Sequence, residues 1–316
     1  MKLNNIKGNT HWIRGGTNTG IYVFEDNTVL LIDPGISGSR QEKIIKLLDE
    51  NNLQLRYIFL THEHEDHVGG ITQLRKKYID VTVISTNKAK ILIENPDLYM
   101  DSIIGGRRPQ ELMDVIYKYI SEPHIDDRNF RCVDEIVFPN DKLEIKGHTF
   151  NIFNCAGHTE GCVGIVTDDG VAFLGDLLIT KNSLDKFDFL FMCDCNSQLK
   201  SLDNLRIVDF EVAILGHSSV IFSKQEALEL ADYNNNVLME HISFILTVLE
   251  KPITFDELIG IIVREKNLRC NYIAYIEYRN SLNALISYLL DKGAIKYVFD
   301  NFVMKYVIST EEKEND

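Results

Sequence analysis

Short apolar runs and segments of helical periodicity alternate over residues 20–85. Residues 40–49 and 71–77 space their apolar positions three and four apart, which predicts helices. The other apolar runs are short and rich in Val, Ile, Leu and Phe, which predicts strands at residues 20–24, 29–32, 57–60 and 81–85. This alternation predicts an α/β fold, in which the strands are buried in sheets and the helices pack outside them.

Residues 87–130 form a more polar insertion that we predict to be largely helical. The stretch NPDLYMDSIIGGRRPQ interrupts it, because the Gly-Gly-Arg-Arg-Pro sequence at 105–109 is incompatible with a helix interior. We therefore expect a mobile hinge or loop there. Further apolar runs predict a second sheet region, with runs at residues 150–153, 163–166, 171–174 and 212–215.

The pattern changes again near residue 224. An amphipathic helix over about 224–249 is followed by three shorter helices, at residues 255–263, about 271–277 and 281–290. Gly293 is a predicted helix C-cap, and an Asp300-Asn301 turn joins strands at 295–299 and 302–307. Three helices and a hairpin are typical of a winged-helix domain. We therefore divide the chain into a larger domain at 1–251, a winged-helix-like domain at 252–308 and a disordered tail at 309–316.

Composition and charge limit the cellular location and the binding partners that we expect. The apolar share of 45% is ordinary for a globular protein, and no apolar run is long enough to span a membrane. The N-terminus lacks a secretory signal, so we expect a cytoplasmic protein with no membrane attachment. The net charge of −14 disfavours nucleic acid as a partner, because binding to nucleic acid depends on neutralising phosphates.

The charge of the C-terminal domain gives a weaker indication of its role. Residues 252–308 contain seven Lys and Arg against six Asp and Glu, a charge of +1, whereas a winged helix that reads DNA shows a clear basic stripe. We therefore favour a packing, homodimer-forming or substrate-gating role for this domain.

The six cysteines are too sparse for a disulfide framework, and we interpret Cys193-Asp194-Cys195 as reduced thiols rather than a soft-metal or redox site.

The residues with the clearest chemistry directly follow the strand at 57–60. The sequence LTHEHEDHVGG places His62, His64, Asp66 and His67 in an H-x-H-x-D-H pattern. From an irregular loop, His62 and His64 can point at one centre while Asp66 and His67 reach a second. Imidazole nitrogen and carboxylate oxygen are ligands that borderline divalent metals such as Zn²⁺ prefer. One metal needs three or four ligands, so the remaining ligands should sit at other strand ends.

Three such candidates follow apolar strands later in the chain. NCAGHTEGC contains His158, VAFLGDLL contains Asp176 and AILGHSS contains His217, each next to a glycine. Asp33, in LIDPG, ends an earlier strand in a predicted turn. Side chains of ligand type that repeatedly follow a strand and a glycine indicate a shared metal site.

As a set, these motifs resemble those of the metallo-β-lactamase fold superfamily, over about residues 10–222. The resemblance implies an αββα sandwich that holds two divalent metal ions, with Zn favoured over Fe or Mn. It also implies that Asp33 fixes the histidine loop through hydrogen bonds. The implied ligands are His62, His64 and His158 for one ion, Asp66, His67 and His217 for the other, and Asp176 as the bridge between both.

The resemblance further implies an activity. Two metals can share a bridging water, lower its pKa and polarise a substrate oxygen, while Asp66 can accept or relay a proton. The leading hypothesis is a binuclear hydrolase of a small-molecule ester, thioester or lactone, similar to glyoxalase II-like members. One alternative is a phosphodiesterase or ribonuclease of the same fold, with Arg107, Arg108 and Lys181 as candidate phosphate contacts. The other is an iron-dependent redox enzyme similar to persulfide dioxygenases, which bind one iron with fewer ligands.

Several neighbouring residues receive no role in this site, and substrate-binding residues are not identified. Glu63 and Glu65 alternate with the ligands and are expected to face away from them. Ser218-Ser219 stand where members of the superfamily often have Gly-Pro, so this loop is expected to suit a different substrate. Structural roles are expected for the remaining candidates, which are Cys155, Cys162, His11, His124, His148 and His241.

Overall fold

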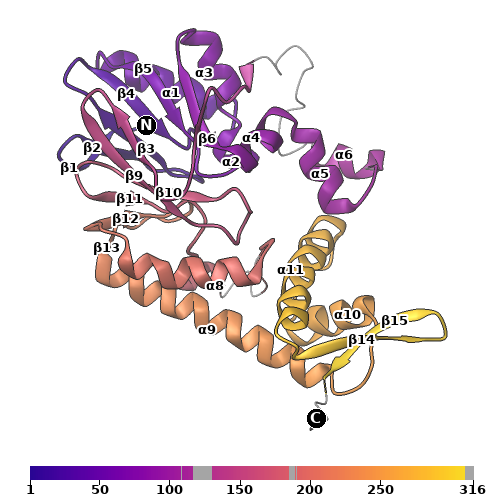
Figure 1. The fold of residues 1–316 in the computed structure, drawn as a ribbon. Coiled ribbons are helices and arrows are strands. Elements are labelled where there is room, and N and C mark those ends of the chain that lie inside the picture. The colour runs from indigo at the N-terminus through magenta and orange to yellow at the C-terminus, as the bar shows by residue number, and fades with distance from the viewer. Residues whose placement is uncertain (108, 117–129, 185–188, 190, 310–316) are drawn as a thin grey trace.

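The computed structural model describes residues 1–107, 109–116, 130–184, 189 and 191–309. Within these residues, two β-sheets face each other and helices cover their outer faces (Figure 1). The first sheet is antiparallel from β1 to β4 and parallel from β4 to β7. Its strands in spatial order are β1 (Asn4–Lys7), β2 (Thr10–Ile13), β3 (Thr19–Val23), β4 (Thr28–Ile32), β5 (Gln54–Phe59), β6 (Thr82–Thr86) and β7 (Glu135–Val137).

The second sheet contains strands from the later part of the chain. All its neighbours are antiparallel except β11 and β12, which are parallel. Tyr22 and Leu30 of the first sheet pack against Phe150 and Ile165 of the second, which forms the apolar core between the sheets. The strands in spatial order are β13 (Phe222–Ser223), β12 (Val212–Ile214), β11 (Val171–Phe173), β10 (Val163–Val166), β9 (His148–Asn154) and β8 (Lys142–Ile145).

Amphipathic helices form the two outer layers. Ile44 and Leu74 pack α1 (Ser39–Glu50) and α3 (Ile71–Lys77) against the first sheet. Leu202 and Leu230 pack α8 (Cys195–Asn204) and α9 (Lys224–Val248) against the second. The predicted αββα sandwich is thus confirmed. Short helical segments connect the layers, at α2 (Glu65–Val68), α7 (Lys181–Leu184) and the 3₁₀ turn η2 (Leu205–Ile207).

The insertion after β6 contains α4 (Asn87–Glu94), α5 (Pro96–Ile104) and α6 (Gln110–Ile116) among the described residues. The expectation that residues 95–104 interrupt the helical pattern is wrong. Pro96 occupies the first turn of α5, where a missing N–H is no loss. Gly105 then ends α5 with a φ of 78°, so the glycine pair lies outside a helix, as predicted. Residues 117–129, also predicted to be helical, lie outside the described residues.

Beyond residue 251, the described chain forms two helices rather than the predicted three. These are α10 (Phe255–Glu265) and α11 (Tyr272–Asp291), and α11 is one continuous helix over both predicted segments. The polar residues at 277–281 do not break it, because Ser281 Oγ donates to the Glu277 carbonyl oxygen within the helix. Ser281 is buried in line with Leu285, so the apolar face of the helix continues through this region.

A hairpin of β14 (Ile295–Asp300) and β15 (Val303–Ile308) follows α11. Its turn is Asn301-Phe302, one residue later than predicted, and φ values of 48° and 64° match the left-handed backbone of tight hairpin turns. Gly293 ends α11, as predicted, since its N–H donates to the Leu290 carbonyl oxygen. Ile253, ahead of α10, pairs with Tyr306 of β15.

One apolar cluster joins α9 to the C-terminal elements. Ile245 of α9 packs in the same cluster as Leu258 of α10, Leu285 of α11 and Phe189. The long helix α9 therefore contributes to the cores on both sides of residue 251. The boundary there and the winged-helix assignment stay predictions, and residues 310–316 of the predicted tail lie outside the described residues. Among the described helices, none combines the length and the hydropathy needed to cross a membrane.

Gly293→Ala is expected to lower the free energy of unfolding by about 1 kcal/mol. Gly293 has a φ of +66° and open space where a Cβ would lie, so the loss comes from backbone strain alone. Gly260→Ala is the matched control, because Gly260 lies inside α10 and is also surrounded by open space. That change should raise the free energy of unfolding by up to about 1 kcal/mol. Urea unfolding measures both, and shifts of the same sign would contradict the expectation.

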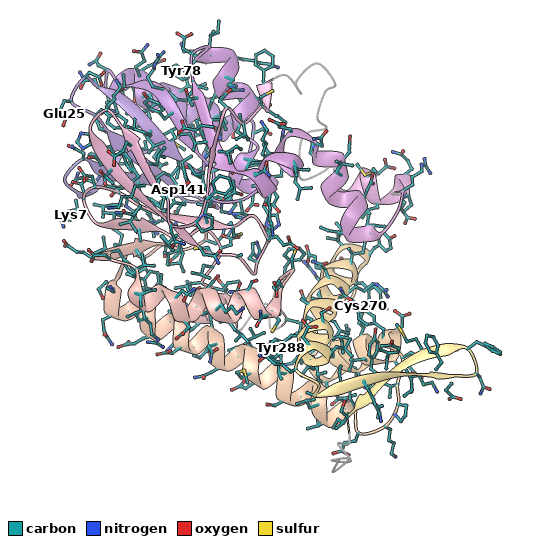
Figure 2. The ribbon with its side chains drawn as sticks, viewed as in Figure 1. Lys7, Glu25, Tyr78, Asp141, Cys270 and Tyr288 are labelled. Atoms are coloured by element: carbon teal, nitrogen blue, oxygen red, sulfur yellow. The ribbon has the colours of Figure 1, made fainter. Side chains whose placement is uncertain are left out.

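His148 of β9 links both sheets at the rim of the sandwich, where Figure 2 shows Glu25. Its Nδ1 lies 2.9 Å from the Tyr22 hydroxyl and 2.9 Å from Asp168 Oδ2, and its Nε2 lies 3.1 Å from Glu25 Oε1. The hydrogen bonds to Asp168 and Glu25 raise the pKa of His148 above its usual value of 6.5. The expected structural role of His148 is thus supported by contacts that favour its protonated form.

Because the pKa of His148 is higher in the folded state, its protonated form stabilises the fold fully below about pH 6.5 and loses this effect as the pH rises through the raised pKa. His148→Gln should therefore lower the free energy of unfolding more at about pH 5.5 than at about pH 8.5. Denaturant titrations at both pH values measure this. His11→Gln is the control, since the His11 ring bonds to Asn5 and to the Asn9 carbonyl rather than to carboxylates. An equal loss at both pH values for His148→Gln would refute the expectation.

Candidate metal centre

The seven ligand-type residues found in the sequence gather at one edge of the sandwich. His62 and His64 follow β5, and Asp66 and His67 lie in α2. His158, Asp176 and His217 come from the loops after β9, β11 and β12 of the second sheet. One sheet therefore supplies four of these side chains and the other sheet three, and the site lies where the two sheets meet.

The first group consists of His62, His64, His158 and Asp176, whose candidate ligand atoms all lie within 4.8 Å of one another. His158 Nε2 lies 2.9 Å from His64 Nδ1 and 3.6 Å from Asp176 Oδ2. His62 Nε2 lies 3.9 Å from the same carboxylate oxygen. This group is largely buried, since His62 is fully covered and His158 nearly so.

The second group consists of Asp66, His67 and His217, again with ligand atoms within 4.8 Å. His217 Nε2 lies 3.1 Å from Asp66 Oδ2 and 3.4 Å from His67 Nε2. Asp176 reaches this group as well, with Oδ1 3.4 Å from His67 Nε2 and Oδ2 3.3 Å from His217 Nε2. The Asp176 carboxylate thus lies between the two groups.

Hydrogen bonds outside the cluster orient its imidazole rings. Asp33 Oδ2 lies 2.9 Å from His67 Nδ1, as expected for a residue that fixes the histidine loop. The Phe191 carbonyl oxygen lies 3.1 Å from His158 Nδ1, and the Gly16 carbonyl oxygen lies 2.6 Å from His217 Nδ1. These contacts occupy Nδ1 in three rings and turn each Nε2 towards the cluster.

Sequence reasoning missed these backbone contacts and also Thr61. The Thr61 backbone N–H donates to Asp33 Oδ1 at 2.8 Å and its hydroxyl donates to Asp33 Oδ2 at 2.7 Å. The same hydroxyl lies 3.0 Å from His62 Nδ1. A hydroxyl residue immediately before the H-x-H pattern was the available signal for Thr61, whereas carbonyl contacts leave no trace in residue identity.

Burial and charge act differently on the two groups. Burial, together with the neighbouring His67 and His64, lowers the pKa of His62 well below its usual value, and burial lowers the pKa of His64 to about 3. Burial also opposes protonation of His217, but hydrogen bonds to Asp176 and Asp66 outweigh it and raise the pKa of His217 to about 10. The first group therefore offers neutral imidazoles, and in the second a cation would replace protons that the neighbouring carboxylates stabilise on the imidazoles.

The donor set fits a divalent metal ion. His62 Nε2 is buried and has no hydrogen-bond partner among the described residues, which costs free energy unless a further group binds there. Imidazole nitrogens and carboxylate oxygens at this spacing are the donors that zinc, iron and manganese use in proteins. The chemistry and the geometry of the cluster thus agree with two adjacent metal positions.

The residues that alternate with the ligands face away from the cluster, as expected. Glu65 pairs with Arg131 at 2.7 Å, and Glu63 accepts a hydrogen bond from the Thr159 hydroxyl at 3.0 Å. Both contacts fix the loop on the side that faces away from the ligand atoms. Cys155 and Cys162 are buried in an apolar cluster, which supports a packing role, and burial raises the pKa of both thiols.

The other candidates from the sequence lie apart from the ligand atoms. Burial raises the pKa of Cys193 to about 11 and that of Cys195 to about 12, in keeping with unreactive thiols. His241 is buried in α9 and lines a cavity next to His158, a position that sequence reasoning did not anticipate. His124 and Arg108 lie outside the described residues.

Known proteins match this chain over the region that forms the site. The Metallo-beta-lactamase superfamily model matches residues 12–217. Hydroxyacylglutathione hydrolase GloC of Haemophilus influenzae is 30% identical over 210 residues, which cover 64% of this chain and 85% of that protein. Hydroxyacylglutathione hydrolase 1 of Vibrio vulnificus is 30% identical over 158 residues, which cover 50% of this chain and 46% of that protein. The chain thus matches less than half the length of the Vibrio protein.

A solved structure extends the likeness of fold beyond the matched region. A beta-lactamase domain protein from Burkholderia ambifaria superposes with a TM-score of 0.70 at 15% identity, over 97% of this chain and 94% of that one. The superposition therefore includes most of the C-terminal helices and hairpin. Since the family model spans well over half of its residues, the chain belongs to the metallo-beta-lactamase superfamily, among relatives that are hydrolases.

Proposed function

We propose that this protein is a hydrolase that uses two divalent metal ions to cleave a small-molecule thioester, ester or lactone. The observation that carries the proposal is the position of Asp176, whose two carboxylate oxygens lie within 3.6 Å of imidazole nitrogens in both ligand groups. A carboxylate between two sets of imidazoles supports two ions that share one ligand. Zinc suits these donors best, and iron and manganese bind the same types of ligand.

In this assignment each ion has its own ligands. His62, His64 and His158 would hold the first ion, and Asp66, His67 and His217 the second. Asp33, which bonds to His67 Nδ1, would keep that ring in the tautomer that presents Nε2 to the ion. Two bound ions would lower the pKa of a water molecule between them and polarise the carbonyl oxygen of the substrate.

Asp66 is the residue best placed to move a proton. Its side chain is 45% exposed, at the open side of the cluster, and its Oδ2 accepts a hydrogen bond from the Thr17 hydroxyl. In thioester hydrolysis the oxygen of water bonds to the carbonyl carbon, the C–S bond breaks, and the departing sulfur takes up a proton. Asp66 Oδ2 would receive the proton that water loses and pass it to the leaving group.

The relatives named hydroxyacylglutathione hydrolase support a thioester as the substrate. The net charge of −14 supports a small molecule over a nucleic acid. The phosphodiesterase and redox alternatives stay as competing hypotheses, and the cytoplasmic location and the homodimer stay predictions. Assays with a panel of substrates distinguish the thioester hydrolase from the phosphodiesterase.

Gly216→Ala is expected to reduce the bound metal from about two ions per chain to one or fewer. A Cβ at residue 216 would overlap Asp176 Oδ1 and come 2.8 Å from His67 Cε1, so both groups must move apart. Gly16→Ala is the matched control, because Gly16 also borders the site but has open space around its Cα. Elemental analysis of protein purified without chelator measures the metal. Equal metal content in both variants, or none in the unchanged protein, would contradict the assignment.

Hydrolysis should be fastest for a thioester, ester or lactone when S-acyl thioesters, lactones, bis-p-nitrophenyl phosphate and single-stranded RNA are assayed side by side.

Asp176→Ala should lower kcat on the order of a thousandfold, because both ions lose a shared ligand. Its melting temperature with chelator present should stay close to that of the unchanged protein with chelator. Faster turnover of the phosphodiester or RNA would favour the nuclease hypothesis, and full activity in Asp176→Ala would rule out the bridging role.

A further inference from the structure

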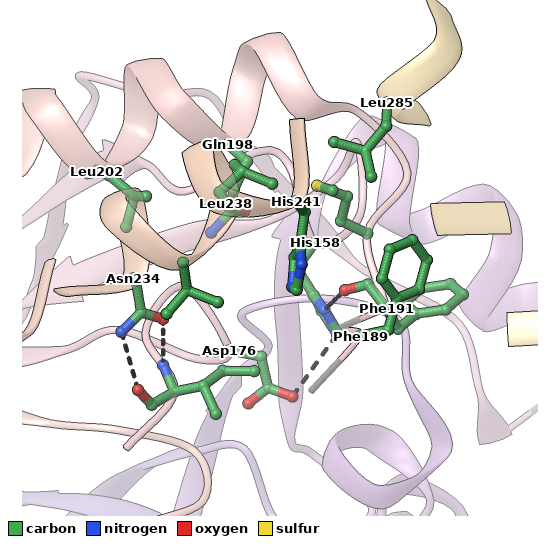
Figure 3. Close-up of a pocket in the computed structure, with 13 residues that line it drawn as sticks. His158, Asp176, Phe189, Phe191, Gln198, Leu202, Asn234, Leu238, His241 and Leu285 are labelled. Carbon is green, nitrogen blue, oxygen red and sulfur yellow. Dashed lines mark hydrogen bonds and ion pairs between the residues drawn. The ribbon is translucent and has the colours of Figure 1, made fainter. Parts of the chain in front are cut away.

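A cavity begins beside His158 and Asp176 and is enclosed by α8, α9, α11 and the side chains of Phe189, Phe191 and Met192. Figure 3 shows His158 and Asp176 on one side of it and Leu202, Leu238 and Leu285 on the other. The two proposed metal ligands form part of the cavity wall. A group bound in the cavity would therefore be attached to, or next to, the atom at which hydrolysis takes place.

The wall of this cavity is mostly apolar. Leu202 of α8, Leu238 of α9 and Leu285 of α11 line it and are each at least 93% buried. Phe189 and Met192 complete the wall and are also buried. Because Leu285 belongs to α11, the C-terminal region contributes directly to the surface that faces the ligand atoms.

Some of the polar groups in the wall are already bound within the protein, although Gln198 Oε1 is buried without a hydrogen-bond partner among the described residues. Asn234 Oδ1 accepts from the Ile179 backbone N–H, and Asn234 Nδ2 donates to the Ile179 and Leu230 carbonyl oxygens. Gln198 Nε2 donates to the Leu177 carbonyl oxygen. His241 places its ring 5.3 Å from the ring of Phe189. Because the remaining polar groups are few beside the apolar ones, a charged or strongly polar ligand would regain only part of its lost hydration here, whereas an apolar one loses nothing.

On the other side of the cluster, the surface is more polar than the cavity wall. A groove beside His217 is lined by hydroxyl groups, by Lys181 and by two carboxylates, Glu226 and Glu229, alongside the apolar side chains of Val220, Phe222 and Leu230. The serine pair Ser218-Ser219 lies in this groove, which is where the chain differs from the usual sequence of its superfamily. The metal ligands thus separate an apolar cavity from a polar groove.

From these two surfaces we infer that the substrate joins an apolar acyl group to a polar leaving group. The acyl group occupies the cavity at Leu238 and the leaving group lies in the groove at His217. This inference rests on the proposed hydrolase function and specifies its substrate class. The cavity is small, with a volume of about 40 Å³, so the acyl group is a short, slim chain.

Thioesters of N-acetylcysteamine that differ only in the acyl group test this inference on the zinc-loaded full chain. From acetyl through propionyl to butyryl, kcat/KM should rise by roughly threefold to fourfold per added methylene, the effect of burying a CH₂ group, and it should fall again at hexanoyl, which is too long for the cavity. Lactoyl, which is short and carries a hydroxyl, should react more slowly than butyryl. A flat series, or a preference for lactoyl, would overturn the inference while leaving the hydrolase function intact.

Leu238→Trp fills the cavity and should reduce kcat/KM for the butyryl thioester at least tenfold, and for the acetyl thioester by much less. Leu238→Ala should move the optimum to a longer chain. Ile242→Ala is the matched control, since Ile242 is buried one turn further along α9 but does not line the cavity. Melting temperatures show whether each variant is folded, and Leu285→Ala replaces any Leu238 variant that is not. The same chain-length profile in the Leu238 variants and in Ile242→Ala would refute the acyl assignment.

Binding of the acid product gives a readout that does not depend on turnover. Calorimetry should show that butyrate binds at least tenfold more tightly than acetate, and that Leu238→Trp removes the difference. If no thioester is hydrolysed, the proposed function fails, and this measurement alone decides the nature of the cavity. Equal affinities for butyrate and acetate would then overturn the inference as well.

Discussion

The candidate metal centre depends on one buried carboxylate. Asp33 is 3% exposed and accepts hydrogen bonds from the Thr61 backbone and hydroxyl, and it pairs with His67. These contacts join the end of β4 to the end of β5 and to α2, so they set the path of the whole histidine loop. A buried charge without such partners would be strongly unfavourable, and its hydrogen bonds therefore define one arrangement of the loop.

The packing of the two sheets determines the rest of the geometry. The ligands of the first sheet arrive on one loop, whereas His158, Asp176 and His217 arrive on three separate loops of the second sheet. Their distances to the histidine loop follow from how Tyr22, Phe150 and their neighbours fill the space between the sheets. Well-packed interiors tolerate little change in volume, so the apolar core holds the ligand atoms in place without touching them.

The sequence predicted those features that depend on local pattern. Alternating apolar runs and helical periodicity predicted an α/β fold with ligand-type residues at strand ends, and the resemblance of these motifs to the superfamily implied the αββα sandwich and the gathering of all seven side chains. Predictions based on polar interruptions were less successful. Pro96 begins α5 rather than preventing it, and the polar residues near Ser281 are accommodated inside α11.

Features that depend on tertiary contact left no comparable signal. The carbonyl groups that orient His158 and His217 could be supplied by any residue type. The cavity beside Asp176 needs Leu238 and Leu285 from helices far apart in sequence, and each reads as an ordinary core residue by itself. Sequence patterns therefore located the reactive groups, and only the folded arrangement gave the shape of the space beside them.

The length of α9 has a consequence for dissecting the protein into fragments. Its 25 residues span about 38 Å, with Leu230 packed under the second sheet and Ile245 in the C-terminal cluster. A fragment that stops at residue 251 would keep the whole helix but expose the apolar face of its C-terminal half to solvent. Exposed apolar surface of that kind promotes aggregation. The N-terminal part alone is thus expected to be unstable as a separate fragment, although it contains every proposed metal ligand.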